Sequence, residues 1–126
     1  MVIESIMTLP LFSNYTQVNN YPVLSQLPTT TIEIKYPTIE EVKNEIEKQS
    51  AESGLNKQIA LDIAFCESSF KWDARNPNSS AKGIFQFTDP TWRWIKAKGH
   101  QFDYKENIKL FIKYYPIYPG WWEQCN

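Results

Sequence analysis

Histidine and glycine are both scarce in this chain of 126 residues: His100 is the only histidine, and glycine occurs four times. A zinc site built from a cluster of histidines is therefore excluded, and no glycine-rich phosphate-binding loop is found. Basic residues are not in excess either, since the formal net charge is −1, whereas nucleic-acid-binding proteins carry a basic stripe or excess. We expect no metal, no cofactor and no nucleic-acid partner.

Long hydrophobic runs are also missing. No stretch approaches the about 20 apolar residues that span a bilayer, so we expect no transmembrane segment. The N-terminal run MVIESIMTLPLF has an early Glu4, no basic region and a proline among its apolar residues, which makes it a poor signal peptide. Either export uses another route, or the natural N-terminus is missing from this sequence.

Cysteine is limited to Cys66 and Cys125. Free buried cysteines are common, so two cysteines do not compel a disulfide. If they pair, closing a loop of about 60 residues would contribute roughly 4 kcal/mol in the chain-entropy model and would imply an oxidising compartment. All five tryptophans also lie in the second half of the chain. We therefore expect the core there, with surplus aromatic residues that can line a groove.

The chain length allows one domain with a modest core. Residues 1–37 carry only three charged residues and no helical period, and are predicted to be a leader or tether that is largely irregular. The run "TTTIEI" within them has weak strand character but no evident partner strand. Residues 38–126 are predicted to form the domain.

Two helices are expected at the start of that domain. The first begins at Thr38, where Glu41 completes a capping box, and ends at Gly54, which suits a left-handed cap. The second is capped by Asn56 and runs into Glu67. The apolar positions expected to face the core are Ile39, Val42 and Ile46 in the first helix and Ile59, Ile63 and Phe65 in the second.

Two more helices are expected further on. The stretch "DPTWRWIKAKG" has Asp89 at the N-cap, Pro90 at the first helical position and Gly99 at the stop. The stretch "DYKENIKLFIKYYP" has capping-box spacing between Asp103 and Glu106, and its last proline forbids continuation. Between the second and third helices, "GIFQF" suggests a short strand or extended segment. The predicted fold class is mainly α, with a short irregular or β-like arm.

Glu67 is the candidate for acid–base chemistry. A nucleophile pair of Cys66 and His100 is formally possible, but Cys66 ends an apolar helix and Cys125 is available as its partner. A carboxylic acid works as a general acid near neutral pH when its pKa rises from about 4.3 towards 6. Desolvation against apolar neighbours such as Phe70 would raise it. The alternative interpretation is a solvated glutamate at a helix end.

The surroundings of Glu67 follow a pattern. It comprises Glu67, Ser68 and Phe70, a loop of small residues, then Gly83, Ile84, Phe85, Gln86 and Thr91. This pattern resembles the lysozyme-like domain of the soluble lytic transglycosylases. Asn107, Ile108 and Tyr114 match the family's last helix, although Phe111 stands where the family usually has glycine. The resemblance covers about residues 50–126.

A second feature of the pattern is the run Cys66-Glu67-Ser68 with a late Cys125. It is similar to the resuscitation-promoting-factor branch of the same superfamily, where the cysteine before the catalytic glutamate is bonded to one near the end of the domain. This similarity implies a disulfide between Cys66 and Cys125.

The resemblance implies an α+β lysozyme-like fold that cleaves the β-1,4 bond between N-acetylmuramic acid (MurNAc) and N-acetylglucosamine (GlcNAc) in peptidoglycan. Glu67 would protonate the leaving oxygen and then activate the muramyl 6-hydroxyl as a base, which closes an anhydro ring. The substrate-binding residues that it implies are Ser68, Ser69, Gln86, Phe87, Asn107 and Tyr114. We expect a monomer that acts on glycan strands outside the cell, in the periplasm or in the cell envelope.

Alternatives remain open from the sequence. Attack by water would give the products of a hydrolytic lysozyme, and the same fold without catalysis would be a peptidoglycan-binding module. An aromatic patch that meets a partner chain is a third hypothesis. Asp73 is the nearest second carboxylate, although a turn residue is the favoured interpretation. Trp72, Trp121 and Trp122 are candidates for stacking on sugars, with core positions as the simpler explanation.

Overall fold

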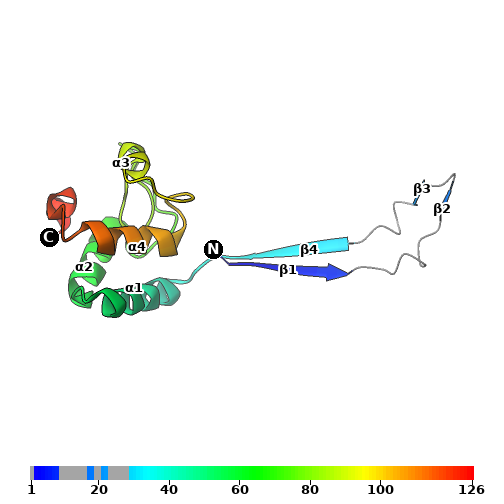
Figure 1. Ribbon diagram of the computed structural model, residues 1–126, viewed down its shortest axis with the longest axis horizontal. Coiled ribbons are helices and arrows are strands. Elements are labelled where there is room, and N and C mark those ends of the chain that lie inside the picture. The colour runs from blue at the N-terminus through cyan, green and yellow to red at the C-terminus, as the bar shows by residue number, and fades with distance from the viewer. Residues whose placement is uncertain (1, 9–16, 19–20, 23–28) are drawn as a thin grey trace. The chain divides into compact units, whose positions relative to one another are not determined.

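The computed structural model describes residues 2–8, 17–18, 21–22 and 29–126. The chain divides into two compact units, Met1–Tyr36 and Pro37–Asn126, and both are drawn in Figure 1. The predicted boundary, between residues 37 and 38, lies one residue further on. The role of the first unit as a leader or tether stays a prediction.

The first unit contains paired strands. Strand β1 (Val2–Thr8) pairs antiparallel with β4 (Thr29–Lys35), and Ile3 lies opposite Ile34 in their register. Strands β2 (Gln17–Val18) and β3 (Tyr21–Pro22) form a second, shorter pair. The described strands were not expected from the sequence, and the other residues of the segment that was predicted to be largely irregular lie outside the described residues. The partner of "TTTIEI" is the N-terminal run itself, and a pairing across so long a connection leaves no local signal in the sequence.

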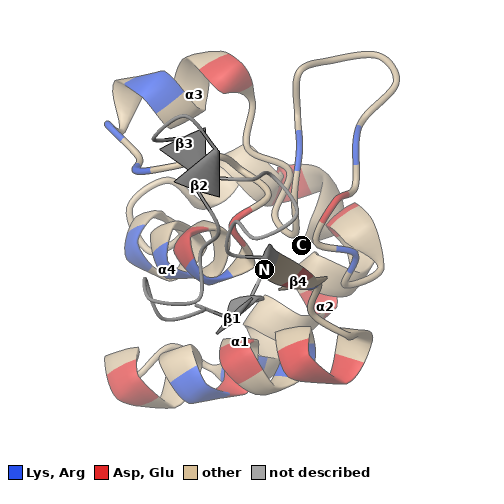
Figure 2. Ribbon diagram, turned by 90° about the vertical axis from the view of Figure 1, so that its right-hand side faces the viewer, with Lys and Arg blue, Asp and Glu red and all other residues tan. Residues whose placement is uncertain are grey.

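The second unit is a small, mainly helical domain, as predicted. Its elements are α1 (Ile39–Ser53), α2 (Lys57–Ser68), α3 (Asp89–Trp94), α4 (Tyr104–Tyr114) and the 3₁₀ helix η3 (Pro119–Cys125). Helix α1 packs against both α2 and α4, and α2 packs against η3 (Figure 1). Acidic and basic residues are mixed along α1 (Figure 2). The helix η3 was not predicted from the sequence.

Three helix starts lie where the sequence predicts them. The Thr38 hydroxyl accepts the backbone N–H of Glu41 at 3.1 Å, and Gly54 ends α1 in the left-handed conformation with φ 81°. The Asn56 side chain accepts an N–H at 2.8 Å at the start of α2, and Asp103 does so at 3.3 Å at the start of α4. These side chains satisfy backbone donors that a helix start leaves free.

Helix α3 departs from its prediction at both ends. Thr88 is the N-cap, and Asp89 is the first helical residue. The carboxylate of Asp89 instead accepts hydrogen bonds from Lys82 at 2.7 Å and Gln101 at 2.6 Å, so it cannot serve as the cap. The helix ends at Trp94, well before Gly99: Lys96 is left-handed with φ 54°, and the Trp92 indole N–H donates to the Gly99 carbonyl at 3.0 Å.

Of the six apolar positions predicted to face the core, three are buried and three are exposed. Val42, Ile46 and Ile63 are buried in the core. The other three positions, Ile39, Ile59 and Phe65, are exposed. The two isoleucines lie in first helical turns. Phe65 is 62% exposed because it is two residues from Ile63, which turns it to the opposite side of the helix.

Candidate active site

Glu67 lies in the last turn of α2, at the edge of that helix's buried face. The buried residues of α2 are Ala60, Ile63, Ala64 and Ser68. Glu67 follows Ile63 by four residues, so its side chain starts from the same stripe and is half-buried. Burial disfavours the charged carboxylate and raises the pKa of Glu67 above its ordinary value of 4.5. Among the described residues, no hydrogen bond or ion pair reaches this carboxyl group.

The backbone turns sharply just after Glu67. Ser69 and Phe70 both adopt left-handed conformations, with φ of 52° and 63°, and the Ser69 N–H closes the helix by donating to Phe65 O at 2.9 Å. Left-handed non-glycine residues cost on the order of 1–3 kcal/mol each and cluster at active sites. The turn therefore ends the helix directly beside the carboxyl group and leads the chain away from it.

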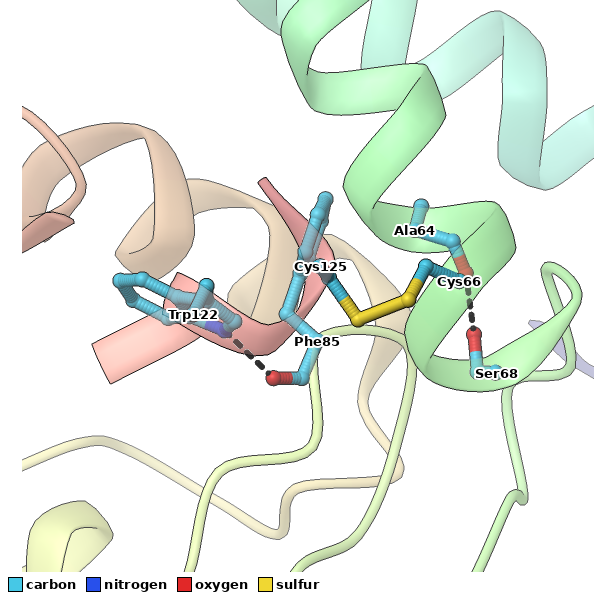
Figure 3. Close-up of a disulfide and its surroundings, with 6 residues drawn as sticks. All are labelled: Ala64, Cys66, Ser68, Phe85, Trp122 and Cys125. Atoms are coloured by element: carbon cyan, nitrogen blue, oxygen red, sulfur yellow. Dashed lines mark hydrogen bonds between the residues drawn. A yellow bond between two sulfur atoms is a disulfide. The ribbon is translucent and has the colours of Figure 1, made fainter. Parts of the chain in front are cut away.

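Ser68 and Ser69 have different surroundings, although both were predicted to bind substrate. The Ser68 side chain is buried, and its hydroxyl donates to the Ala64 carbonyl at 3.1 Å (Figure 3). Ser68 therefore stabilises the end of α2, and its role in substrate binding stays a prediction. Ser69 is exposed, and its hydroxyl remains available to a ligand.

A disulfide joins the end of α2 to η3. Cys66 and Cys125 are bonded, with their Cα atoms 5.7 Å apart (Figure 3), which settles the choice that the composition left open. In η3 the indole N–H of Trp122 donates to the backbone carbonyl of Phe85 at 2.8 Å (Figure 3). The helix end that carries Glu67, the "GIFQF" segment and η3 are therefore tied together.

The arm of residues 70–88 has no helix, as predicted, but "GIFQF" does not form the expected strand or extended segment, because residues 83–86 make a turn. Lys82 forms isolated bridges with Arg75 and Phe87. Gly83, at φ 84°, sits so close to α4 that a Cβ there would collide with the Asn107 side chain and the Gln101 carbonyl. Only glycine fits this approach.

Asn107 was predicted to contact substrate, but the structure gives it another role. Its side chain is 0% exposed. The amide oxygen accepts the Phe85 N–H at 2.9 Å, and the amide nitrogen donates to Gln101 O at 2.8 Å. Asn107 therefore holds the arm against α4 and is a positioning residue.

Gln86 and Phe87 lie at the end of the same segment. Gln86 is left-handed with φ 54°, and its side-chain nitrogen donates to the carbonyls of Ala74 at 3.2 Å and Gly83 at 2.9 Å. These bonds fix the amide and leave its oxygen free to accept. A small hollow beside it is lined by Gln86, Phe87, Thr88, Thr91, Trp121 and Trp122. Phe87 is buried, so it offers little surface to a ligand in this hollow.

Tyr114 and Asp73 complete the predicted set. Tyr114 is half-buried at the end of α4, and its ring stacks on Trp121 with centroids 5.9 Å apart. No hydrogen bond between Tyr114 and Glu67 is found in the part of the chain that the structure describes. Asp73 is exposed in the turn after α2. Trp72 is partly buried and meets Phe102 edge-on at 5.7 Å.

Comparison with known families agrees with this geometry. The model of the family described as "Transglycosylase SLT domain" matches residues 44–114, more than half of the chain and including Glu67. The chain belongs to the transglycosylase SLT domain family. The predicted lysozyme-like transglycosylase domain is thus confirmed. No curated protein and no solved structure matches the chain.

Membership of the SLT domain family has functional consequences. It supports a lytic-transglycosylase type of function that acts on peptidoglycan, and it suggests an extracellular or envelope location. Within the described residues of this SLT domain, no group of three or more His, Cys, Asp or Glu is placed to hold a metal ion. No helix among them is long and apolar enough to cross a membrane.

Sequence reasoning missed two aromatic residues in the second unit of the chain. Trp94 and Tyr118 are exposed and contact Trp121. The only sequence feature that pointed to Trp94 and Tyr118 was the surplus of aromatic residues in the second half of the chain. Composition alone does not distinguish exposed aromatic residues from buried ones.

Proposed function

We propose that this domain cleaves the β-1,4 bond between MurNAc and GlcNAc in peptidoglycan, with Glu67 as its sole acid–base catalyst. The observation that carries the proposal is the state of the Glu67 carboxyl group: half-buried, without a cationic partner among the described residues, and with a pKa raised by burial. Such a carboxyl group keeps its proton closer to neutral pH and can donate it to a leaving oxygen.

The reaction has two steps. Glu67 donates its proton to the glycosidic oxygen as the bond from that oxygen to C1 of MurNAc breaks, and the bonding electron pair stays with the oxygen of the departing GlcNAc. The sugar left behind has oxocarbenium character. The Glu67 carboxylate then takes the proton of the MurNAc 6-hydroxyl while that oxygen bonds to C1. The product is a 1,6-anhydro ring, and Glu67 has recovered its proton.

A single carboxylate is sufficient for this sequence. Glycosidases usually need two, because one must activate water or act as the nucleophile. Here the 6-hydroxyl of the substrate is the nucleophile, and the same Glu67 activates it. Asp73 is exposed in the turn and has no part in the proposed mechanism.

Substrate is held by the groups around Glu67 that remain accessible. Among the described residues no hydrogen bond reaches the side-chain oxygen of Gln86, while its nitrogen donates to two carbonyls, so we assign the oxygen to the N–H of an N-acetyl group. Ser69 is assigned to a sugar hydroxyl because its own hydroxyl is exposed. Tyr114 and Phe87 shape the walls through their ring contacts.

The test is digestion of purified sacculi by the unmodified chain and by Glu67→Gln, with the products identified by mass spectrometry. We expect anhydro-muramyl ends from the unmodified chain and a loss of about 10²–10⁴-fold in rate for Glu67→Gln. Asp73→Asn is the matched control, because it removes an exposed carboxylate six residues away, and should keep its activity. Reducing ends would instead identify a hydrolase. Binding to sacculi without any release would identify a non-catalytic module.

A further inference from the structure

An ion pair closes the segment that carries Gln86. The Lys82 ammonium group donates to Asp89 Oδ1 at 2.7 Å, and these two residues flank residues 83–88. The backbone N–H of Lys82 also donates to the Phe87 carbonyl at 3.1 Å. The two ends of the segment are therefore held together both through side chains and through the backbone.

The same carboxylate reaches a further part of the chain. Asp89 Oδ1 also accepts the side-chain N–H of Gln101 at 2.6 Å, and Gln101 is 4% exposed. The backbone N–H of Asp89 donates to the Ser80 hydroxyl at 2.9 Å. Asp89 thus joins the start of α3 to the arm and to the connection that leads into α4. We call Lys82, Asp89 and Gln101 the clamp.

The groups of the clamp depend on one another. The Lys82 side chain is only 18% exposed, and an ammonium group so far from water needs a partner. Hydrogen bonds from Lys82 and then from Gln101 hold the pKa of Asp89 below its ordinary value of 3.8. The carboxylate is therefore charged at neutral pH. The ion pair Lys43–Glu40, by contrast, spans 3.6 Å between exposed side chains of α1 and is a weak surface pair.

The backbone that the clamp encloses is strained. Gln86 is left-handed with φ 54°, a conformation that a non-glycine residue keeps only where its surroundings over-determine it. Its side-chain amide donates to the carbonyls of Ala74 and Gly83, and both of these partners belong to the arm itself. The clamp adds a constraint from outside the arm, because Asp89 and Gln101 hold the ends of the segment against other elements.

We propose that Lys82 and Asp89 are positioning residues for substrate: the clamp keeps Gln86 left-handed, so that its side-chain oxygen is presented to the N–H of an N-acetyl group. The identity of this ligand rests on the proposed function, but its binding does not require cleavage. Neither Lys82 nor Asp89 lines the hollow beside Gln86, so their effect on sugar binding passes through Gln86.

The test is a double-mutant cycle on Asp89 and Gln86, measured as binding. The full chain carrying Glu67→Gln is the parent, and calorimetry follows its titration with β-1,4-linked hexamers of GlcNAc and of glucosamine, which lacks the N-acetyl groups. Asp89→Asn keeps the shape of the side chain but removes the charge that holds Lys82. We expect it to weaken binding of the GlcNAc hexamer about 10-fold, as Gln86→Ala does, because each loses one hydrogen bond to the ligand.

The combination of the two changes distinguishes positioning from general stability. In the Gln86→Ala background, Asp89→Asn should weaken binding of the GlcNAc hexamer no further. Neither change should alter binding of the glucosamine hexamer. A residue that only stabilised the domain would lower the unfolding midpoint in both backgrounds and would leave the affinity of the folded chain for either hexamer unchanged.

A charge swap and a matched control complete the set. Lys82→Glu combined with Asp89→Lys restores the ion pair with its partners exchanged, and should regain most of the affinity for the GlcNAc hexamer that either change alone loses. Glu40→Ala removes the exposed ion pair on α1 and should leave both affinities unchanged. Circular dichroism at the temperature of the titration establishes that each variant is folded.

Three results would overturn the proposal. One is a folded Asp89→Asn variant that binds the GlcNAc hexamer as tightly as the parent. Another is an additive loss in the double variant, which would mean that the clamp does not act through Gln86. The third is a parent that binds neither hexamer. Failure of the sacculus digestion would leave the binding results intact, so the two proposals fail separately.

Discussion

The rings of Phe85 and Phe111 lie face to face, with centroids 3.7 Å apart and planes 3° apart. Phe111 is fully buried, and its ring also meets that of Trp122 at a steep angle, with centroids 4.9 Å apart. The segment that leads to Gln86 rests on Phe111.

Truncation of Phe111 should therefore open a cavity under the site. We expect Phe111→Ala to lower the free energy of unfolding by about 3–5 kcal/mol, the range for a buried phenylalanine. Phe111→Leu keeps much of the volume and should cost clearly less. Urea denaturation of both variants checks the prediction. If both variants lost the same free energy of unfolding, the volume of the Phe111 side chain would not be the source of its contribution.

The disulfide should account for a large share of the stability of so small a domain. Cys66 and Cys125 are 59 residues apart, and removing such a crosslink should cost roughly 4 kcal/mol in the chain-entropy model. We compare the unfolding midpoint of the unmodified chain with and without a reducing agent. The double variant Cys66→Ser, Cys125→Ser is the control, because its midpoint should be low and should not respond to the reductant. A midpoint that reductant leaves unchanged in the unmodified chain would contradict the prediction.

The sequence was sufficient to predict helices whose ends are set by local chemistry. Thr38, Asn56 and Asp103 each bond a backbone N–H within three residues, so their signals lie inside a short window. Asp89 looked the same, but its carboxylate bonds Lys82 and Gln101, which are seven and twelve residues away. Distant partners overrode a local preference, and no periodicity argument could see them.

In the candidate active site, too, features that are local in the sequence could be predicted and contacts between distant residues could not. Glu67 could be singled out because the end of an apolar helix and the motif after it are both local features. The role of Asn107 could not, because a buried amide that bonds Phe85 N–H and an exposed amide that bonds a sugar look alike in a sequence. Trp94 and Tyr118 meet only when the chain folds, so their contact could not be read from the sequence.

Gly83 and Asn107 are in close contact, and a substitution at either residue should destabilise the domain. Asn107→Ala leaves the Phe85 N–H and the Gln101 carbonyl without their buried partner, at about 1–3 kcal/mol for each unsatisfied group. Gly83→Ala should also destabilise the domain, because of its φ of 84° and the collision of the new Cβ with the Asn107 side chain.

The two changes act on one contact, so we expect them to be less than additive in the double variant, as measured by urea denaturation. As a positioning effect, Asn107→Ala should lower kcat on sacculi while Asn107→Asp, which keeps the shape and the acceptor oxygen, restores part of it. Additive losses of stability would show that the two residues act independently.

The raised pKa of Glu67 makes both activity and stability depend on pH. Both should decrease as pH rises through the raised value. The neutral acid is the proton donor, so kcat/KM should fall as pH rises through the raised pKa. For stability, the folded chain holds this proton more tightly than the unfolded chain does. The resulting stabilisation is fully present below the ordinary pKa of 4.5 and is lost as pH rises through the folded value.

Glu67→Gln should therefore be more stable than the unmodified chain at neutral pH, where it removes a half-buried charge, and should lose this advantage in acid below that ordinary pKa. The gain at neutral pH would accompany the loss of cleavage, because the same desolvation that destabilises the carboxylate produces the proton donor. Thermal unfolding of both chains across the pH range measures the difference. Asp73→Asn, which alters an exposed carboxylate, should show no such trend. If Glu67→Gln were less stable than the unmodified chain at neutral pH, the carboxylate would be stabilised in the fold and could not be the proposed acid.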